Sequence, residues 1–587
     1  MKKNDSHSST NNSRRWKRTE LVLLILYAIA FYLIIIRRSL HLSRDHYSQL
    51  YGLRPGWLTR FTQRPNDVSD AQWRSFRGNL PLITVVFGMF TLVANTLRAY
   101  FDLKARGMSI VWIFISLIYL SYLHGACIVF ILSIASINYL LVKIFARKKY
   151  FALVIWGFNI FFLVCNRVYG GYSFSILGQQ WTYLDNFRGA FRWHICFNFV
   201  VLRMISFGYD YHWADQDSRF DQKKHTQRCH ICKPRQACYH LLQERSLQNG
   251  KYTYSMYICY LVYAPLYLAG PIISFNAFAS QLGVPQTNYS ARDVTCYGLR
   301  WVFSLVLMEL MTHLFHFNAF TISVLWKKLS PMDMFVIGYG AAYCQSMVPS
   351  SLSRETLRVD PGTQGLKFHV AEVLSHLALF SVLVTVVRSF KLQALVSNAP
   401  EETLISLQLC ACSYVESSPQ RICQGVLIIA TTWKVFGKTG MLPTTNGLYM
   451  YIPLGGSQKK LLNVWIIFTF VAIWHDLEWK LLSWAWLTCL FFVPEMILKS
   501  AASAFQVESA FGEFVFRELR AVAGAITITC LMVANLVGYV IGPSGMNWLI
   551  SQFLQEEGLS VVGGMLMTFY VGTKLMFHID DAKQRRQ

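Results

Sequence analysis

The chain contains one apolar run after another, as in proteins whose helices cross a lipid bilayer. A hydrocarbon core about 30 Å thick needs roughly 20 mostly apolar residues per helix. The runs are Leu21–Ile36, Leu80–Leu97, Ser109–Phe145 as two helices, Phe151–Cys165, Trp193–Phe207, Tyr254–Ile273, Trp301–Phe320, Met332–Tyr343, Leu461–Trp474, Leu481–Leu498, Leu519–Ile541 and Val561–Ile579. They predict an all-α fold, a polytopic transmembrane helical bundle with about 11 or 12 membrane spans, some of them broken or re-entrant.

Charge placement supports a membrane rather than a nucleic-acid partner. The 55 basic and 31 acidic residues give a formal net charge of +24, while 54% of all residues are hydrophobic. Basic residues flank apolar runs, where they meet anionic lipid head groups. They include Arg14, Arg15, Lys17, Arg18, Arg37 and Arg38 around the first run and Lys583, Arg585 and Arg586 at the end of the chain. Membrane lipids are therefore the expected partners.

Composition divides the chain into one membrane domain with an interruption. Residues 1–19 predict a disordered basic tail, residues 20–344 and 449–580 the two parts of the membrane domain, and residues 581–587 a second basic tail. Residues 345–448 form an anomalous segment, in which no periodicity holds apart from an apolar stretch at Val370–Val387. A hydrophilic connector is expected from Asp210 to Lys251.

The strongest candidate for a chemical role is His475, which closes an apolar run. A polar ring at that position must find a partner or face a cavity, because an unsatisfied polar group in hydrocarbon is costly. The alternative is an interfacial histidine in an aromatic belt with Trp474 and Trp479. Asp476 and Glu478 follow it, but neighbouring residues on a helix do not face each other. We therefore expect these acids to solvate the helix end rather than form a relay.

Two further segments could line a substrate chamber. Gly455 and Gly456 allow backbone amides to approach a ligand, and Lys459 suits the phosphates of a head group or of coenzyme A; the alternative is an ordinary turn with basic anchors. Gly270 and Pro271, with Pro265, interrupt an apolar helix, as is tolerated where protein or a water-filled cavity satisfies the freed backbone.

The hydrophilic connector is rich in cysteine and histidine. Cys229 and Cys232 have the two-residue spacing of a zinc knuckle, and Cys238 or His240 could complete it. The competing interpretations are palmitoylation sites or a loop that happens to be cysteine-rich, and we expect no metal site.

Three motifs together resemble the membrane-bound O-acyltransferase family. They are LAGPIISF at Leu268–Phe275, YIPLGGS at Tyr451–Ser457 and FVAIWHDLEWKLLSWAWL at Phe470–Leu487. MVANLVGYVIG at Met532–Gly542 adds a likeness to the branch of glycerol-uptake proteins and Hedgehog-acyltransferase-like proteins.

The resemblance implies an enzyme with His475 as its catalytic base. Such an enzyme transfers a long-chain acyl group from acyl-CoA to a lipid or protein acceptor in the endoplasmic reticulum membrane, and it requires no cofactor because the thioester is already activated. Trp474, Asp476, Gly270, Pro271, Gly455, Gly456 and Lys459 are candidates to line its chamber. Two rival functions remain open, a glycerol-uptake-type transporter and a non-catalytic membrane scaffold or inactive isoform.

The anomalous segment departs from this family. Similar members carry a stretch like FWxxWHxSYNxW shortly before YIPLGG, which supplies a second polar site residue, whereas this chain reads VFGKTGMLPTTNGL. Back-translation of Val435–Gly447, with synonymous codons chosen and the frame moved by two bases, spells FWKDWHASYNKW. We therefore hypothesise that residues 345–448 are a frame-shifted or mis-spliced stretch.

Overall fold

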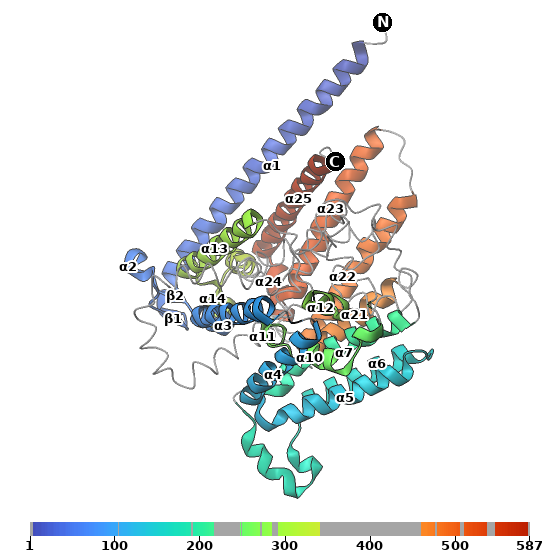
Figure 1. Ribbon diagram of the computed structural model, residues 1–587. Helices are drawn as coiled ribbons and strands as arrows, with labels where there is room; N and C mark the ends of the chain where they lie inside the picture. Colours follow the sequence, from blue (N-terminus) through green and yellow to red (C-terminus); the bar gives the residue numbers. More distant parts are fainter. Residues whose placement is uncertain are drawn as a thin grey trace.

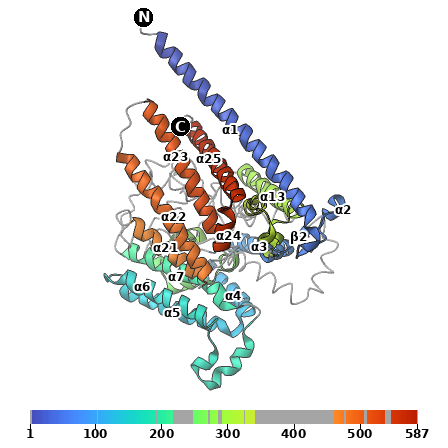
Figure 2. The ribbon, with the colours of Figure 1, turned by 180° about the vertical axis from the view of Figure 1, so that it is seen from behind.

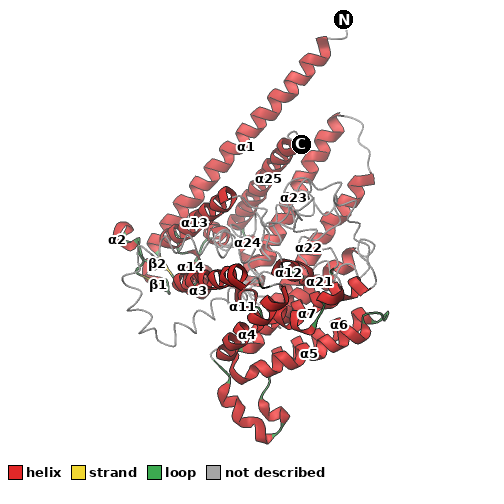
Figure 3. Cartoon of the chain, viewed as in Figure 1, coloured by secondary structure: helices red, strands yellow, loops and turns green. Residues whose placement is uncertain are grey.

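The computed structural model describes residues 4–215, 249–269, 273–283, 291–323, 325–340, 460–475, 478–504, 510–536 and 546–584, with a few single positions left out. The described chain is helical almost throughout (Figures 1 and 3). The larger helices are α1 (Asn4–Asp45), α3 (Ala71–Phe101), α4 (Ala105–His124), α5 (Ile128–Phe145), α6 (Phe151–Val168), α7 (Trp193–Asp215), α10 (Tyr254–Val262), α12 (Phe275–Gly283), α13 (Ala291–Leu314), α21 (Lys460–His475), α22 (Trp479–Ala504), α23 (Ala510–Leu536) and α25 (Glu556–Gln584).

Apolar length in the described residues agrees with a membrane protein. Four stretches are long and apolar enough to span a bilayer, namely Thr19–Asp45, Ala105–Phe145, Phe151–Val168 and Glu556–His578. The second of these contains α4 and α5, separated by a 3-10 turn, η2 (Gly125–Cys127), so the predicted pair of helices is confirmed. Large apolar side chains such as Leu23 and Leu33, each 62% exposed, lie on outer faces where lipid would contact them.

The core of the first bundle lies among α4, α5, α6, α7, α10 and α12. Its buried side chains are mainly aromatic and branched, and they include Phe197, Phe207 and Tyr257, all 0% exposed. In α7 fifteen consecutive residues from Cys196 to Asp210 are buried, because neighbouring helices cover every face.

A second group of helices carries the two ends of the chain. Helices α1, α25, α23 and α22 lie side by side, and α21 packs against α22 (Figures 1 and 2). Phe31 of α1 packs against Phe335 in the helical stretch at residues 331–340, with ring centroids 6.3 Å apart. The two halves of the predicted membrane domain therefore form one helical assembly, joined to the first bundle through α21.

A short hairpin fills the space between α1 and α3. Strands β1 (Leu53–Arg54) and β2 (Asn66–Asp67) pair antiparallel, with Leu53 opposite Asp67, and the small helix α2 (Thr59–Thr62) lies between them. The Asp67 carboxylate accepts a hydrogen bond from the backbone N–H of Ala319 at 2.9 Å, at the start of α14 (Phe317–Ile322). This acid therefore stabilises an otherwise unpaired helix N-terminus.

Two boundaries differ from the sequence-based predictions. Helix α1 begins at Asn4, within the tail predicted to be disordered, because extending a helix that is already nucleated costs little per residue. Helix α7 continues to Asp215, past the predicted start of the connector at Asp210. The Asp210 carboxylate is 1% exposed and binds the backbone of α12, so this acid belongs to the protein interior.

Candidate active site

The helix that carries His475 ends at this residue. The structure describes the backbone of His475 and the whole of Trp474. The other predicted chamber residues, Asp476, Gly270, Pro271, Gly455, Gly456 and Lys459, lie outside the described residues, as do the zinc candidates Cys229, Cys232, Cys238 and His240. Among the residues that the structure describes, no group of three or more metal-ligating side chains occurs.

Two reciprocal hydrogen bonds hold the last turn of α21 against α7. The Asn198 Nδ2 donates to the backbone carbonyl of Trp474 at 2.7 Å, and the Trp474 Nε1 donates to the backbone carbonyl of Asn198 at 2.9 Å. The Trp474 ring also meets Phe199 edge to face, with centroids 5.3 Å apart. Each such hydrogen bond is worth about 0.5–1.5 kcal/mol net. Together they fix the peptide that immediately precedes His475.

Apolar side chains surround this clamp. Trp474, 9% exposed, packs with Leu163 of α6, with Phe199 and Leu202 of α7 and with Phe470 one turn earlier on α21. Exclusion of water lowers the local dielectric constant, which strengthens every hydrogen bond made there. The end of α21 is therefore held rigidly in a dry setting.

The broken helix near Pro265 is confirmed. Helix α10 ends at Val262, Tyr263 leaves the helical conformation with ψ 109°, and α11 (Ala264–Ala269) resumes with Pro265 in its first turn, where proline is tolerated. The Arg203 guanidinium, 1% exposed, donates to the carbonyl of Leu261 at 2.8 Å and to that of Leu266. A charged side chain from α7 thus satisfies backbone groups that the break exposes.

A second pair of α7 side chains holds the start of α12. The Ser206 Oγ accepts from the N–H of Phe275 at 3.2 Å, and the Asp210 Oδ2 accepts from the N–H of Asn276 at 2.9 Å. Ser206 and Asp210 are one helical turn apart and so lie on one face of α7. With Asn198 and Arg203, they make α7 the polar support of the helix ends around it.

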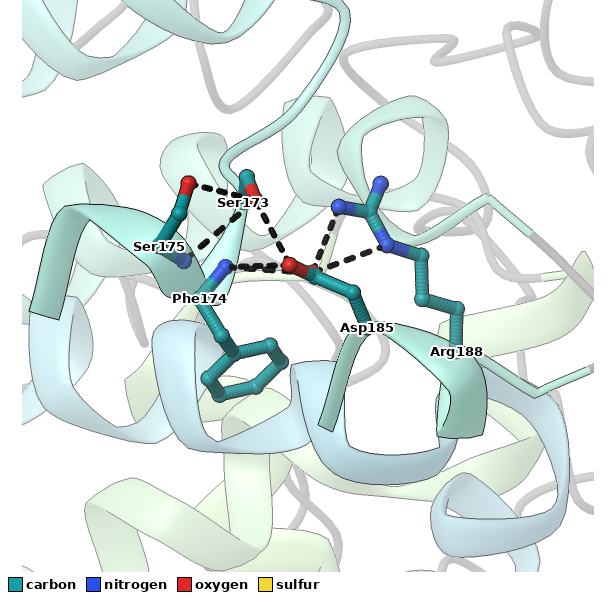
Figure 4. A network of polar contacts seen from close by, with 5 residues as sticks. All are labelled: Ser173, Phe174, Ser175, Asp185 and Arg188. Atoms are coloured by element: carbon teal, nitrogen blue, oxygen red, sulfur yellow. Dashed lines mark hydrogen bonds and ion pairs between the residues drawn. The ribbon is translucent and has the colours of Figure 1, made fainter. Parts of the chain in front are cut away.

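The loop between α6 and α7 is folded around Asp185. The carboxylate accepts from the Ser173 Oγ at 2.6 Å, from the Phe174 N–H at 3.0 Å and from Arg188 at 2.6 Å (Figure 4). These hydrogen bonds, that of Ser173 first, lower the pKa of Asp185 to about 2. Gly171 lies in this loop, three residues after the end of α6 at Val168. A Cβ added at Gly171 would come within 2.9 Å of the His194 Nδ1 in the first turn of α7.

The interpretation of the sequence missed Asn198, Arg203 and Asp210. All three are polar residues in or directly after the apolar run Trp193–Phe207, and ionisable residues within a membrane span are rare and usually functional. That signal was present in the sequence. The hydrogen-bond partners of these residues could not be read from the sequence, since Trp474 lies 276 positions away from Asn198.

Comparison with known proteins agrees with this architecture. The model of the membrane-bound O-acyltransferase family matches residues 178–349 and 448–534, leaving between them residues 350–447 of the anomalous segment. The membrane-bound O-acyltransferase gup1 of Schizosaccharomyces pombe is 26% identical, over 90% of this chain and 82% of its own length.

Two further relatives extend the likeness. The membrane-bound O-acyltransferase GUP1 of Saccharomyces cerevisiae is 26% identical, over 98% of this chain and 94% of its own length. The protein-cysteine N-palmitoyltransferase HHAT of Mus musculus is 25% identical, over 54% of this chain and 56% of its own length. With the apolar helices, the family match and these likenesses support an integral, multi-pass membrane protein that is similar to the membrane-bound O-acyltransferase family and, by that resemblance, an acyltransferase.

Proposed function

We propose that the chain transfers a long-chain acyl group from acyl-CoA to the hydroxyl of a lipid acceptor in the endoplasmic reticulum membrane, with His475 as general base. The observation that carries the proposal is the pair of reciprocal hydrogen bonds between Asn198 and Trp474. They fix the residue before His475 among buried apolar side chains. A base must be positioned before its pKa can be used. Trp474, Asp476, Gly270, Pro271, Gly455, Gly456 and Lys459 are proposed to surround the substrates.

The proposed reaction needs only groups that the substrates and one imidazole supply. The imidazole of His475 takes the proton of the acceptor hydroxyl while the hydroxyl oxygen attacks the thioester carbonyl. The new C–O bond forms, the C–S bond breaks, and the departing thiolate receives a proton. No redox step occurs, and the acyl group is already activated as a thioester.

The test is acyl transfer by the purified chain in vesicles. Labelled palmitoyl-CoA serves as donor, and a total lipid extract of the host membrane supplies the acceptor. His475→Ala should lower turnover by about 10²–10⁴-fold, the range expected for loss of a general base. His41→Ala is the matched control, because its side chain is 66% exposed and bonds only locally to Asp45. A transporter or a scaffold would be indifferent to both substitutions.

The reading frame of residues 345–448 is tested separately. Sequencing the cDNA across codons 340–450 should recover a frame that encodes FWKDWHASYNKW, and the chain with that stretch should be the more active one. If the sequence as given is recovered instead, the frame hypothesis is wrong. Co-fractionation with an endoplasmic reticulum marker tests the proposed location.

A further inference from the structure

Asn166 on α6 is a buried amide whose side chain has no hydrogen-bond partner among the residues that the structure describes. Its side chain is 1% exposed, and among the described residues nothing bonds to its Nδ2 or to its Oδ1. A buried polar group that makes no hydrogen bond costs free energy, so native proteins rarely keep one without a reason. The preceding buried asparagine of the same helix, Asn159, donates both to Asn138 Oδ1 at 3.0 Å and to the Ile155 carbonyl at 2.8 Å.

Asn198 presents a second unused acceptor. Its Nδ2 serves the clamp on Trp474, but its Oδ1 has no partner among the described residues, and the residue is 5% exposed. The hydrogen bond from Nδ2 therefore fixes the orientation of the amide, and the Oδ1 accepts no hydrogen bond from the described residues.

Helix register places the two asparagines at the same level. Helices α6 and α7 run antiparallel, because Trp156 contacts Tyr209 at 3.1 Å near one end and Gly171 meets His194 near the other. Between these contacts, Leu163 packs in one cluster with Phe199, Leu202 and Trp474. Asn166 lies one turn beyond Leu163 on the buried face of α6, which is level with Asn198.

The same level is where α21 ends. Trp156 of α6 meets Phe470 of α21, with ring centroids 5.1 Å apart, and Leu163, further along α6, belongs to the same apolar cluster as Trp474, one turn further along α21. Asn166 and His475 thus lie near the ends of α6 and α21 that share this cluster, with Asn198 beside it on α7. Among the described residues, the side-chain atoms without a partner at this level are the Nδ2 and Oδ1 of Asn166 and the Oδ1 of Asn198.

We propose that Asn166 and Asn198 form the subsite that binds the hydroxyl of the acyl acceptor beside His475; this inference rests on the proposed function. The hydroxyl oxygen can accept from the Asn166 Nδ2, and its single proton can be donated to the Asn198 Oδ1 until the O–H turns to the imidazole of His475. When the hydroxyl oxygen attacks the thioester, its proton passes to His475, the C–O bond forms, and the C–S bond breaks. The asparagines hold the nucleophile and are unchanged at the end.

A buried water is the simpler occupant of such a site. A water would make Asn166 a structural residue, whose loss lowers stability. An acceptor subsite instead predicts that an apolar residue of similar size is tolerated by the fold and harms only acceptor use, because functional sites often carry groups that cost stability.

The experiment is Asn166→Leu in the full chain, assayed with labelled palmitoyl-CoA while the concentration of host lipid extract is varied. We expect an unchanged or higher unfolding midpoint and a rise of about tenfold or more in the half-saturating lipid concentration, as for loss of one hydrogen bond to substrate. Half-saturation by palmitoyl-CoA should stay unchanged. If the leucine variant does not fold, Asn166→Ala should likewise raise the half-saturating lipid concentration and leave half-saturation by palmitoyl-CoA unchanged.

Asn159→Leu is the control, because the Nδ2 of this asparagine donates two hydrogen bonds, although its Oδ1 has no partner among the described residues. It should lower the unfolding midpoint and leave half-saturation by lipid unchanged. Unchanged acceptor use in an active Asn166→Leu variant overturns the subsite. A wild-type chain that neither transfers nor hydrolyses palmitoyl-CoA instead overturns the proposed function itself, and the subsite with it.

Discussion

Arg203 shows how much of this fold can depend on one buried side chain. Its guanidinium donates to two carbonyls on either side of the break between α10 and α11, at Leu261 and Leu266. A planar group with five donors suits two acceptors in this way, whereas the ammonium of lysine is a point charge. The arginine thus lets a broken helix remain inside the bundle.

Arg203→Met should destabilise the chain by roughly 2–4 kcal/mol, because two buried carbonyls lose their donors at about 1–3 kcal/mol each while the cost of burying the charge is relieved. Arg203→Lys should lie between this variant and the wild type. The unfolding midpoint of the detergent-solubilised protein measures the effect. Arg106→Met, at an exposed position of α4, is the control and should change little. Equal midpoints for the two methionine variants would contradict the assigned role.

At the scale of elements, apolar runs predicted most helices, because burial in lipid or in a bundle requires long stretches of apolar residues. The pair α4 and α5, the helix α6 and the break near Pro265 were all read correctly from the chain. The helix pairings were not, since a run does not reveal which helix it meets. The contact between Asn198 and Trp474 depends on such a pairing and could not be predicted. The role of His475 as base is a prediction that comes from a sequence motif.

The loop between α6 and α7 carries a prediction about pH. Since the pKa of Asp185 is lowered from 3.8 to about 2, the ionised form stabilises the loop fully above about pH 4, and this contribution is lost as the pH falls toward 2. At neutral pH, Asp185→Asn should therefore loosen the loop. Hydrogen exchange of the Phe174 amide should become several-fold faster.

The control for this loop is Asn186→Asp, next to the same site but outside the hydrogen bonds drawn in Figure 4. It should leave exchange at Phe174 unchanged. If Asp185→Asn exchanges at the wild-type rate, the carboxylate does not organise the loop, and its short contacts with Ser173 and Arg188 have no energetic weight.

At the scale of the whole molecule, one lysine joins the two ends of the chain. Lys574 of α25, 6% exposed, bonds to Glu20 of α1 and, at 2.6 Å, to Glu518 of α23, which also accepts from the Tyr570 hydroxyl. One cation thus lies between two carboxylates from different helices. Removing it would leave two like charges facing each other in a partly buried place, with the His578 ring 3.3 Å from Glu20. Breaking a fully buried pair costs about 3–5 kcal/mol, so the cost at this partly exposed place is smaller.

Lys574→Met should therefore separate α1 from α25. Cross-linking of Tyr27→Cys to Thr568→Cys by a short bifunctional thiol reagent, at positions whose native hydroxyl oxygens are 3.1 Å apart, reports the approach of these helices, and its yield should fall in the methionine variant. A reagent is needed because the tyrosine hydroxyl lies well beyond its Cβ, so the two Cβ atoms are too far apart for a direct disulfide. Adding Glu20→Gln and Glu518→Gln removes the repulsion and should restore much of the yield, because effects of contacting residues are not additive. A cross-linking yield that stays the same through all these changes would mean that apolar packing alone holds the N-terminal helix in place.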